Sequence, residues 1–324
     1  MSIRLAVLAA LRDANEAGLS GETLAHELGV SRVAVGKHVQ ALRAEGYRID
    51  AVPGTGYLLR ETPDAPLPAE VAPLLESRMW GALEGGGETG STNDDARALA
   101  RGGADEGTVV LASTQTAGRG RLGRTWDSPA GGAYFSAVMR PSVAPSQVSP
   151  LALVVGLGIA RGLVRLGADV RLKWPNDVLL SGGKVAGVLL EMTAEVDAVE
   201  WVVAGVGLNV SRPSGSGCTH PQAAYLSDVV PGVRIPTAVA AVLDGIAETY
   251  AIWLEAGFSA LREEYDARSS LAGADVTVSD RDGTPRASGR VHGVDEEGRL
   301  LLLGEDGPHA IVAGEVTLRT PSHG

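Results

Sequence analysis

Three arginines alternate with glycines in the segment Gln115–Trp126, and this pattern is suited to binding an anion. The segment reads QTAGRGRLGRTW and carries Arg119, Arg121 and Arg124. Guanidinium groups bind phosphate or carboxylate oxygens through paired hydrogen bonds, and glycines leave backbone N–H groups accessible. A triphosphate or an acyl phosphate is therefore a suitable ligand. The segment is neither a P-loop nor a dinucleotide fingerprint, because the Gly-Lys-Ser/Thr ending and the strand-to-helix context are missing. Arginine–glycine runs also occur in RNA-binding tails, and this segment alone leaves that alternative open.

A second candidate is the segment Lys173–Asp177, of sequence KWPND, which is followed by a glycine turn and Lys184. Pro175 interrupts a strand, so Asn176 and Asp177 are expected at a bend, where an amide and a carboxylate can hold a cation or orient an amine. Lys184 beside the glycine turn is a candidate phosphate partner. A simple surface ion pair of a lysine with an aspartate is the alternative interpretation.

The apolar strand Trp201–Val210 contains two glycines, Gly205 and Gly207, and ends near Asn209. Glycines weaken a strand, so they are best explained by a ligand or another backbone that lies close. Asn209 would then face that ligand. A buried strand whose asparagine begins a turn is equally consistent with this segment.

Polar residues also precede a helical stretch at Ser91, Thr92 and Asn93. Such residues commonly cap helices, because their side-chain oxygens accept hydrogen bonds from free backbone N–H groups. A ligand-binding role is the other interpretation.

The composition is that of a packed protein with more than one domain. The chain has 324 residues, 44% of them hydrophobic, and a net charge of -11. One core rarely grows this large, and the charge argues against general coating of nucleic acid, so any DNA site must be local. The sole cysteine, Cys218, excludes an intrachain disulfide and is compatible with a reducing cytoplasm. The apolar runs at residues 5–11 and 151–160 are shorter than the roughly 20 residues that span a bilayer, so we expect no membrane association and a cytoplasmic location.

Residues 1–62 are expected to form a winged helix-turn-helix domain. Ser20 can cap one helix and Ser31 the next, whose Val35, Val39 and Leu42 share one face. A turn at residues 53–56 separates two strands, as in a wing. The polar face of the second capped helix supplies the DNA-binding candidates Ser31, Arg32, Lys37, Gln40 and Arg43. A small helical domain that binds a partner protein is the alternative.

The rest of the chain is predicted to be α+β. A stiff, proline-rich linker is expected at residues 63–76, and a domain built on a mixed sheet at residues 77–270. Short strands separated by Asp/Glu/Gly turns predict a small SH3-like β-barrel at residues 271–324.

The joint occurrence of GRGRLGRTW, KWPND, GGKVAGVLLEM and GVGLN, in this order, resembles the biotin protein ligases. The N-terminal winged helix resembles the bifunctional kind that also represses biotin synthesis operons. The resemblance implies a ligase that uses ATP and Mg²⁺ to make biotinyl-5′-AMP and transfers biotin to a lysine of the biotin carboxyl carrier protein of acetyl-CoA carboxylase. It also implies operator DNA as a partner and a homodimer when the adenylate is bound. A lipoate ligase and a DNA-binding biotin sensor without ligase activity are the competing hypotheses.

The resemblance also implies residue roles. It places biotin against Ser91, Thr92, Asn93, Gln115, Gly118, Arg119 and Lys184. It places ATP and the adenylate against Arg119, Arg121, Trp126, Asn176, Lys184, Asn209 and Arg319. The catalytic candidates are Arg119, Arg121 and Lys184 for phosphate charge, and Asp177 for the acceptor amine. No protein ligand to a metal is implied, since Mg²⁺ would be held by the ATP phosphates. The chain departs from the family at the glycine-rich stretch 85–87 and at Leu122, where relatives often carry a basic residue.

Overall fold

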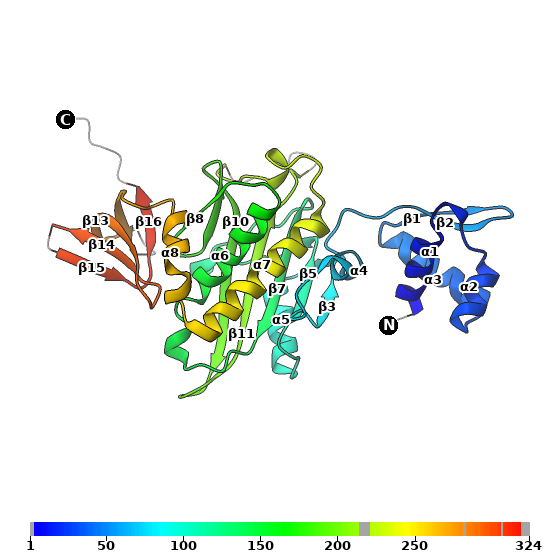
Figure 1. The fold of residues 1–324 in the computed structure, drawn as a ribbon, viewed down its shortest axis with the longest axis horizontal. Coiled ribbons are helices and arrows are strands. Elements are labelled where there is room, and N and C mark those ends of the chain that lie inside the picture. Colours follow the sequence, from blue (N-terminus) through cyan, green and yellow to red (C-terminus); the bar gives the residue numbers. More distant parts are fainter. Residues whose placement is uncertain (1–2, 214–220, 281–282, 306, 319–324) are drawn as a thin grey trace. The chain divides into compact units, whose positions relative to one another are not determined.

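The computed structural model describes residues 3–213, 221–280, 283–305 and 307–318 (Figure 1). The chain divides into two compact units, Met1–Asp64 and Ala65–Gly324. The expectations for Cys218 and Arg319 concern residues outside the described ranges.

The first unit is a winged helix-turn-helix, as predicted. Its second and third helices begin at serine caps: the Ser20 Oγ accepts from the Thr23 N–H at 2.9 Å, and the Ser31 Oγ accepts from the Ala34 N–H at 3.1 Å. The two strands of the wing pair antiparallel. The core of the unit is apolar and fully enclosed, and includes Val7, Leu8, Leu11, Leu24, Val35, Val39 and Leu42. The elements are α1 (Ile3–Ala14), η1 (Asn15–Ala17), α2 (Gly21–Leu28), α3 (Arg32–Ala44), β1 (Arg48–Val52) and β2 (Gly56–Glu61).

The segment expected to be a linker over residues 63–76 is folded into the second unit from Ala65 onward, so this prediction is wrong for most of its length. Two short helices form there, α4 (Pro68–Val71) and η2 (Ala72–Leu74). Val71 is fully buried in the main core, and the Asp244 carboxylate accepts from the backbone N–H of Glu76. The prolines predicted stiffness, but they carry no information about burial against distant residues.

The second unit is built on a mixed seven-stranded sheet of order β3-β5-β7-β11-β10-β9-β8. The β3–β5 pair is parallel and the other pairs are antiparallel. The strands are β3 (Ala82–Gly85), β5 (Thr108–Ala112), β7 (Gly132–Met139), β8 (Val170–Lys173), β9 (Asp177–Leu180), β10 (Gly183–Ala194) and β11 (Val199–Asn209). A separate parallel pair is formed by β4 (Glu88–Thr89) and β6 (Thr114–Gln115).

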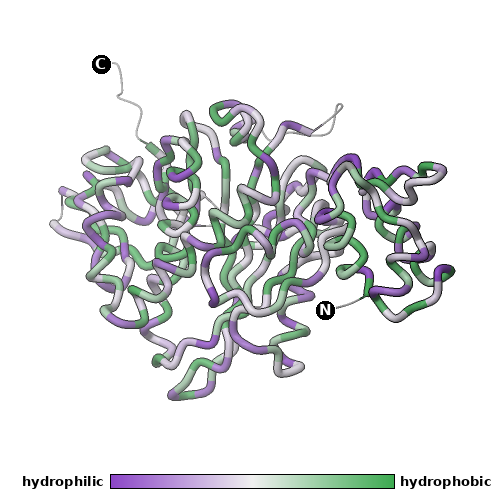
Figure 2. Tube along the Cα trace, turned by 45° about the vertical axis from the view of Figure 1, so that its right-hand side comes forward, coloured by the Kyte–Doolittle hydropathy of each residue, from purple (hydrophilic) through white to green (hydrophobic). Residues whose placement is uncertain are grey.

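Helices cover both faces of this sheet. On one face, α6 (Leu151–Arg165) and α7 (Ile235–Ala256) pack against each other, with α8 (Ser259–Arg268) beside them (Figure 1). A Cβ at Gly158 would lie 2.6 Å from the Ile246 Cα, so glycine is required where these two helices cross. On the other face, α5 (Thr92–Arg101) packs through Ala96 and Ala100. Hydrophobic and hydrophilic segments alternate along the chain (Figure 2).

The segments Pro145–Arg165 and Ile235–Ala256 are long and apolar enough to span a membrane by composition alone. In each, 72% of the most apolar window is buried within the protein. Such burial is typical of core helices, which pass the same test of length and hydropathy. The first segment is longer than its apolar run because the 3-10 turn η4 (Pro145–Val148) precedes α6.

The C-terminal part of the second unit is a five-stranded antiparallel sheet of order β15-β14-β13-β12-β16. The expectation of an all-β segment is confirmed, whereas its closure into an SH3-like barrel stays a prediction. Its strands are β12 (Asp275–Ser279), β13 (Pro285–Val294), β14 (Leu300–Gly304), β15 (Gly307–Ile311) and β16 (Glu315–Leu318). In the described ranges the edge strands β15 and β16 do not pair with each other, so the sheet is open there. The buried indole of Trp174 donates to the Gly298 carbonyl at 2.9 Å and ties this sheet to the KWPND bend.

Candidate active site

A small pocket lies between the start of α5, the arginine–glycine loop and the glycine-bearing strands β10 and β11. It brings together residues from all four sequence segments that were expected to carry chemistry. Its lining is Ser91, Thr92, Asn93, Gln115, Arg119, Gly120, Arg121, Trp126, Asn176, Lys184, Gly187, Val188, Leu189, Gly205, Val206 and Gly207.

One wall of the pocket is a buried network of neutral polar groups. Thr92 and Asn93 are 3% and 4% exposed, respectively. The Gln115 Oε1 accepts from the Thr92 backbone N–H at 2.9 Å, and its Nε2 donates to the Ser128 Oγ at 2.9 Å. The Ser136 Oγ lies 2.8 Å from the Thr92 hydroxyl and 2.6 Å from the Asn93 Oδ1. Such a wall can recognise the N–H and C=O groups of an uncharged ring through fixed donors and acceptors.

Ser136 was missed by the sequence-based argument. It lies in the middle of β7, whose residues are all buried, and its hydroxyl bonds within this network. A serine inside the run Ala133–Met139 is the signal that could have identified it, because a buried hydroxyl needs a partner.

The capping interpretation of the segment at Ser91 is not supported. Ser91 occupies the N-cap position of α5, but its side chain makes no capping hydrogen bond. Its backbone carbonyl accepts the first helical bonds from Asp94 and Asp95. The Ser91 side chain is 4% exposed and lines the pocket.

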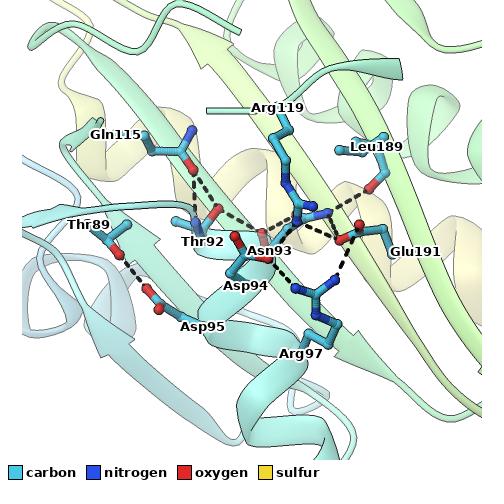
Figure 3. Close-up of polar contacts among 11 residues, drawn as sticks. Thr89, Thr92, Asn93, Asp94, Asp95, Arg97, Gln115, Arg119, Leu189 and Glu191 are labelled. Carbon is cyan, nitrogen blue, oxygen red and sulfur yellow. Dashed lines mark hydrogen bonds and ion pairs between the residues drawn. The ribbon is translucent and has the colours of Figure 1, made fainter. Parts of the chain in front are cut away.

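Arg119 is held by two acidic residues that the sequence-based argument had not singled out (Figure 3). Its Nη2 lies 2.8 Å from the Asp94 Oδ1 and 3.1 Å from the Glu191 Oε2. Arg97, which lies one turn after Asp94 on α5, also pairs with both carboxylates. The Arg119 Nε is buried, and no residue in the described ranges accepts its proton. A ligand oxygen that reached this nitrogen would satisfy it.

A larger cavity adjoins the pocket and collects the phosphate-binding candidates. The Lys184 Nζ lies 2.6 Å from the Asp177 Oδ1 and 4.7 Å from the centre of the Trp126 ring. The Arg121 Nη1 donates to the Asn176 Oδ1 at 3.3 Å. Both cationic side chains line the cavity, so Lys184 and Asp177 are not a simple surface pair. The cavity also includes Leu122, Arg124, Thr125, Asp127, Lys173, Asn209, Tyr225, Val316, Thr317 and Leu318.

Asn176 and Asn209 position other parts of the site through their side-chain amides. The Asn176 Nδ2 donates to the Val188 carbonyl at 2.9 Å, which fixes the bend that follows the cis peptide Trp174–Pro175. The Asn209 Nδ2 donates to the Lys184 carbonyl at 3.1 Å. Asn209 therefore anchors the backbone of Lys184 and also lines the larger cavity.

The glycines of β10 and β11 make room for side chains of the site. A Cβ at Gly205 would lie 1.9 Å from the Asn93 Oδ1, and a Cβ at Gly207 would lie 2.4 Å from the Trp126 indole. A Cβ at Gly187 would also approach Trp126 to 2.9 Å. The close neighbour that these glycines predicted is therefore a side chain. Trp126, which packs against Gly187 and Gly207, lines both cavities.

The arginine–glycine loop is a folded part of the domain, which excludes the RNA-binding tail considered for this segment. The Trp126 N–H donates to the Gly118 carbonyl at 3.0 Å, and the Gly120 N–H donates to the Arg124 carbonyl at 2.7 Å. Between them lies the 3-10 turn η3 (Arg121–Gly123). Gly118 lines neither of the two cavities described above, but a Cβ there would lie 2.4 Å from the Trp126 carbonyl, so glycine is needed to close the loop.

Tyr265 is an uncharged neighbour of Asp177. Burial raises the pKa of the Tyr265 hydroxyl above its ordinary value, and the nearby carboxylates of Asp266 and Asp177 raise it further. Tyr265 therefore stays protonated. No group of three or more His, Cys, Asp or Glu side chains that could hold a metal ion occurs in the described part of the chain.

Four of the five DNA-binding candidates at α3 are exposed, and the fifth, Arg43, is bound to the wing. Arg32, Lys37 and Gln40 are exposed on the helix, and Ser31 caps it while remaining exposed. Arg43 differs from the expectation, because its Nε and Nη2 both donate to the Ile49 carbonyl, at 2.8 and 2.6 Å. Arg43 thus fastens the helix to the wing.

The fold and the site together define a protein with a cationic site beside a buried polar wall in one unit and a helix-turn-helix in a separate unit. Residues 89–209 match the model of the biotin/lipoate A/B protein ligase family, residues 4–58 match an HTH domain, and residues 273–319 match the biotin protein ligase C-terminal domain.

Sequence similarity to known proteins covers nearly the whole chain. The bifunctional ligase/repressor BirA of Bacillus spizizenii is 33% identical over 307 residues, covering 93% of this chain and 94% of that protein. BirA of Escherichia coli is 31% identical, with 93% of each chain covered. The biotin protein ligase of Aquifex aeolicus, solved in complex with biotin and ATP, superposes with a TM-score of 0.63 at 29% identity, covering 74% of this chain and 99% of that one. The chain belongs to the biotin protein ligase family, in the bifunctional ligase/repressor form.

Proposed function

We propose that this protein joins biotin to the AMP portion of ATP in the two adjoining cavities, with release of pyrophosphate, and then transfers the biotinyl group to a lysine of the biotin carboxyl carrier protein of acetyl-CoA carboxylase. The observation that carries the proposal is the convergence of Arg119, Arg121 and Lys184 around the junction of the two cavities, in a chain whose net charge is -11. Guanidinium and ammonium groups gathered at one site of an acidic protein are suited to the phosphates of ATP and the carboxylate of biotin.

The smaller pocket is assigned to the biotin ring and the larger cavity to the nucleotide. A neutral ureido ring needs fixed donors and acceptors, which Thr92, Asn93 and Gln115 provide from the buried wall. Ser91 completes that side of the pocket. Trp126, Asn176 and Asn209 border the larger cavity, where an aromatic face and two amides suit a nucleoside.

In the first half-reaction a biotin carboxylate oxygen attacks the α-phosphate of ATP, and pyrophosphate leaves. Negative charge builds up on the α-phosphate, and fixed cations at that point stabilise the transition state. Lys184 and Arg121 are held by Asp177 and Asn176, respectively, so their charges are in place before the reaction begins. Arg119 supplies a buried donor on the biotin side.

In the second half-reaction the acceptor lysine attacks the carbonyl of the mixed anhydride, and AMP leaves. A lysine amine has a pKa near ~10.4 and must lose a proton before it attacks. We assign this role to Asp177, whose carboxylate borders the larger cavity beside Lys184. The KWPND bend therefore serves both half-reactions.

Mg²⁺ would accompany the ATP phosphates. Mg²⁺ binds protein sites through few ligands and usually keeps several waters together with substrate phosphates. Such an ion would neutralise phosphate charge when ATP is bound.

The second function is repression through the N-terminal unit. Arg32, Lys37 and Gln40 form a polar, exposed face on α3, which is the helix that enters the major groove in this class of domain. We infer that two copies bind an operator as a homodimer, since one small unit with few basic residues makes few phosphate contacts. The protein would act in the cytoplasm, where its nucleotide, acceptor and operator occur together.

Incubation with biotin, ATP and a biotin carboxyl carrier domain tests the proposal directly. Intact-mass measurement of the acceptor should show one added biotinyl group, dependent on ATP and lost when the acceptor lysine is replaced. Replacement of biotin by lipoate tests the competing lipoate ligase. A folded protein that binds biotin and operator DNA but never modifies the acceptor would instead be a sensor.

A further inference from the structure

The anchoring of Arg119 by acidic side chains is not explained by the assigned ligand contacts. Asp94 and Glu191 carry negative charge at the edge of a site that must accept a carboxylate and a phosphate. Unpaired acids there would repel both substrates. Arg97 pairs with both carboxylates, so the cluster of Asp94, Arg97, Arg119 and Glu191 has no net charge (Figure 3).

The cluster fixes one end of the Arg119 guanidinium. Both carboxylates accept from the same nitrogen, Nη2. Glu191 is itself immobilised, because it lies on β10 and its Oε2 accepts from the Asn93 Nδ2 at 3.0 Å. The Arg119 Nε remains buried without an acceptor in the described ranges. The guanidinium is thus oriented, with its outer nitrogen on protein carboxylates and its inner donor left for a ligand.

Orientation matters more for this arginine than for most. Arg119 lies between two glycines, Gly118 and Gly120, and a long side chain on such a loop loses much conformational freedom when it binds. A side chain that is already held loses less, so more of its interaction energy appears as affinity. The unpartnered Nε adds to this, because a ligand oxygen would satisfy a donor that is costly to leave buried.

We propose that Asp94 and Glu191 are positioning residues of the ligase: they hold Arg119 so that it retains the biotinyl-adenylate, and Arg97 offsets their charge. The inference rests on the proposed function, in which Arg119 contacts the intermediate. Neither acid touches the substrate in this scheme.

The test measures the dissociation rate of preformed biotinyl-adenylate from the full-length protein. Asp94→Asn and Glu191→Gln should each release the adenylate about 3- to 10-fold faster, which is the effect of weakening a charged hydrogen bond at a partly exposed site. Asp95→Asn is the matched control. It removes the same charge from the same helical turn, but Asp95 bonds to the Thr89 hydroxyl and not to Arg119.

The same substitutions in an Arg119→Ala background separate positioning from a general structural role. If the acids act through Arg119, then Asp94→Asn and Glu191→Gln no longer accelerate release once Arg119 is absent. Equal acceleration in both backgrounds, or acceleration by Asp95→Asn as large as by Asp94→Asn, would overturn the proposal. Thermal unfolding of each variant identifies effects that arise from the fold itself.

Failure of the positioning role and failure of the proposed function would give different results. If Arg119→Ala releases the adenylate quickly while both acid variants retain it as the unsubstituted protein does, then only the positioning role is wrong. If Arg119→Ala itself retains the adenylate, then the proposed contact of Arg119 with the intermediate is wrong and the positioning role falls with it.

Discussion

Lys184→Ala should slow formation of the biotinyl-adenylate while leaving the biotin pocket intact. The Lys184 side chain pairs with Asp177 at 2.6 Å, and its Nζ lies over the Trp126 ring at 4.7 Å. Its backbone is held independently, by the Asn209 amide and by hydrogen bonds with Gln222 and Ala224. Truncation therefore removes the charge without moving the strand.

The expected effect on the rate is much larger than the effect on stability. A preorganised charge that faces developing negative charge contributes about 3 to 4 kcal/mol, which corresponds to a roughly 100- to 1,000-fold slower reaction. The Lys184 and Asp177 side chains are 30% and 25% exposed, so the loss of their ion pair should cost at most about 1 kcal/mol of folding free energy. Biotin affinity should change by less than about threefold, because the substitution leaves the Thr92–Gln115 hydrogen bonds in place.

Single-turnover pyrophosphate release measures the first quantity, and biotin titration by calorimetry measures the second. Lys184→Arg is the informative comparison, because it keeps the charge but changes the donor geometry, and it should be intermediate. An unchanged rate of pyrophosphate release in Lys184→Ala would refute the assignment. Equal losses of rate and of biotin affinity would mean that the substitution had damaged the pocket.

Three other outcomes are expected. Removal of residues 1–64 should abolish operator binding in gel shifts while leaving most acceptor biotinylation, because every residue of the two cavities belongs to the second unit; a folded truncation without ligase activity would show that the units share the site. Operator binding, measured by gel shift, and dimerisation, measured by sedimentation, should require biotin and ATP together or a stable adenylate analogue. The bound adenylate would hold the arginine–glycine loop in place, which lowers the entropic cost of forming a dimer surface that includes this loop. A protein that is dimeric without ligand would contradict this prediction. Hydrogen bonding to Arg161 lowers the pKa of the Glu264 carboxyl below its ordinary value of 4.5. Glu264→Gln should therefore lower the free energy of unfolding by about 0.5 to 1 kcal/mol at pH 7, and this difference should shrink as the pH falls below about 4.5. A difference that grows at acidic pH would show that the assigned direction is wrong.

The local rules of sequence predicted the elements and the motif residues. Ser20 and Ser31 cap helices as their positions indicated, and the wing follows from its turn. Glycines in β10 and β11 correctly indicated a close neighbour, since Asn93 and Trp126 occupy that space. These signals are short in range, so a single sequence contains them.

Long-range partners were not predictable in the same way. Asp94 and Glu191 are 97 residues apart, and only the packing of α5 against the sheet brings both to Arg119. The Arg43 guanidinium was expected on the DNA-binding face, but the Ile49 carbonyl of the neighbouring strand binds it instead. Val71 in the presumed linker is buried by α7 and other distant elements. In each case the contact depends on tertiary packing that the local sequence pattern does not contain.

The measurement that tests the central claim most directly is biotin-dependent exchange of labelled pyrophosphate into ATP, made without any acceptor protein. Exchange requires reversible formation of an acyl-adenylate, so it isolates the step assigned to Arg119, Arg121 and Lys184. We expect label to enter ATP only when biotin is present, and at a rate that falls about 100- to 1,000-fold in Lys184→Ala. Absence of exchange in a folded protein that binds both biotin and ATP would contradict the account.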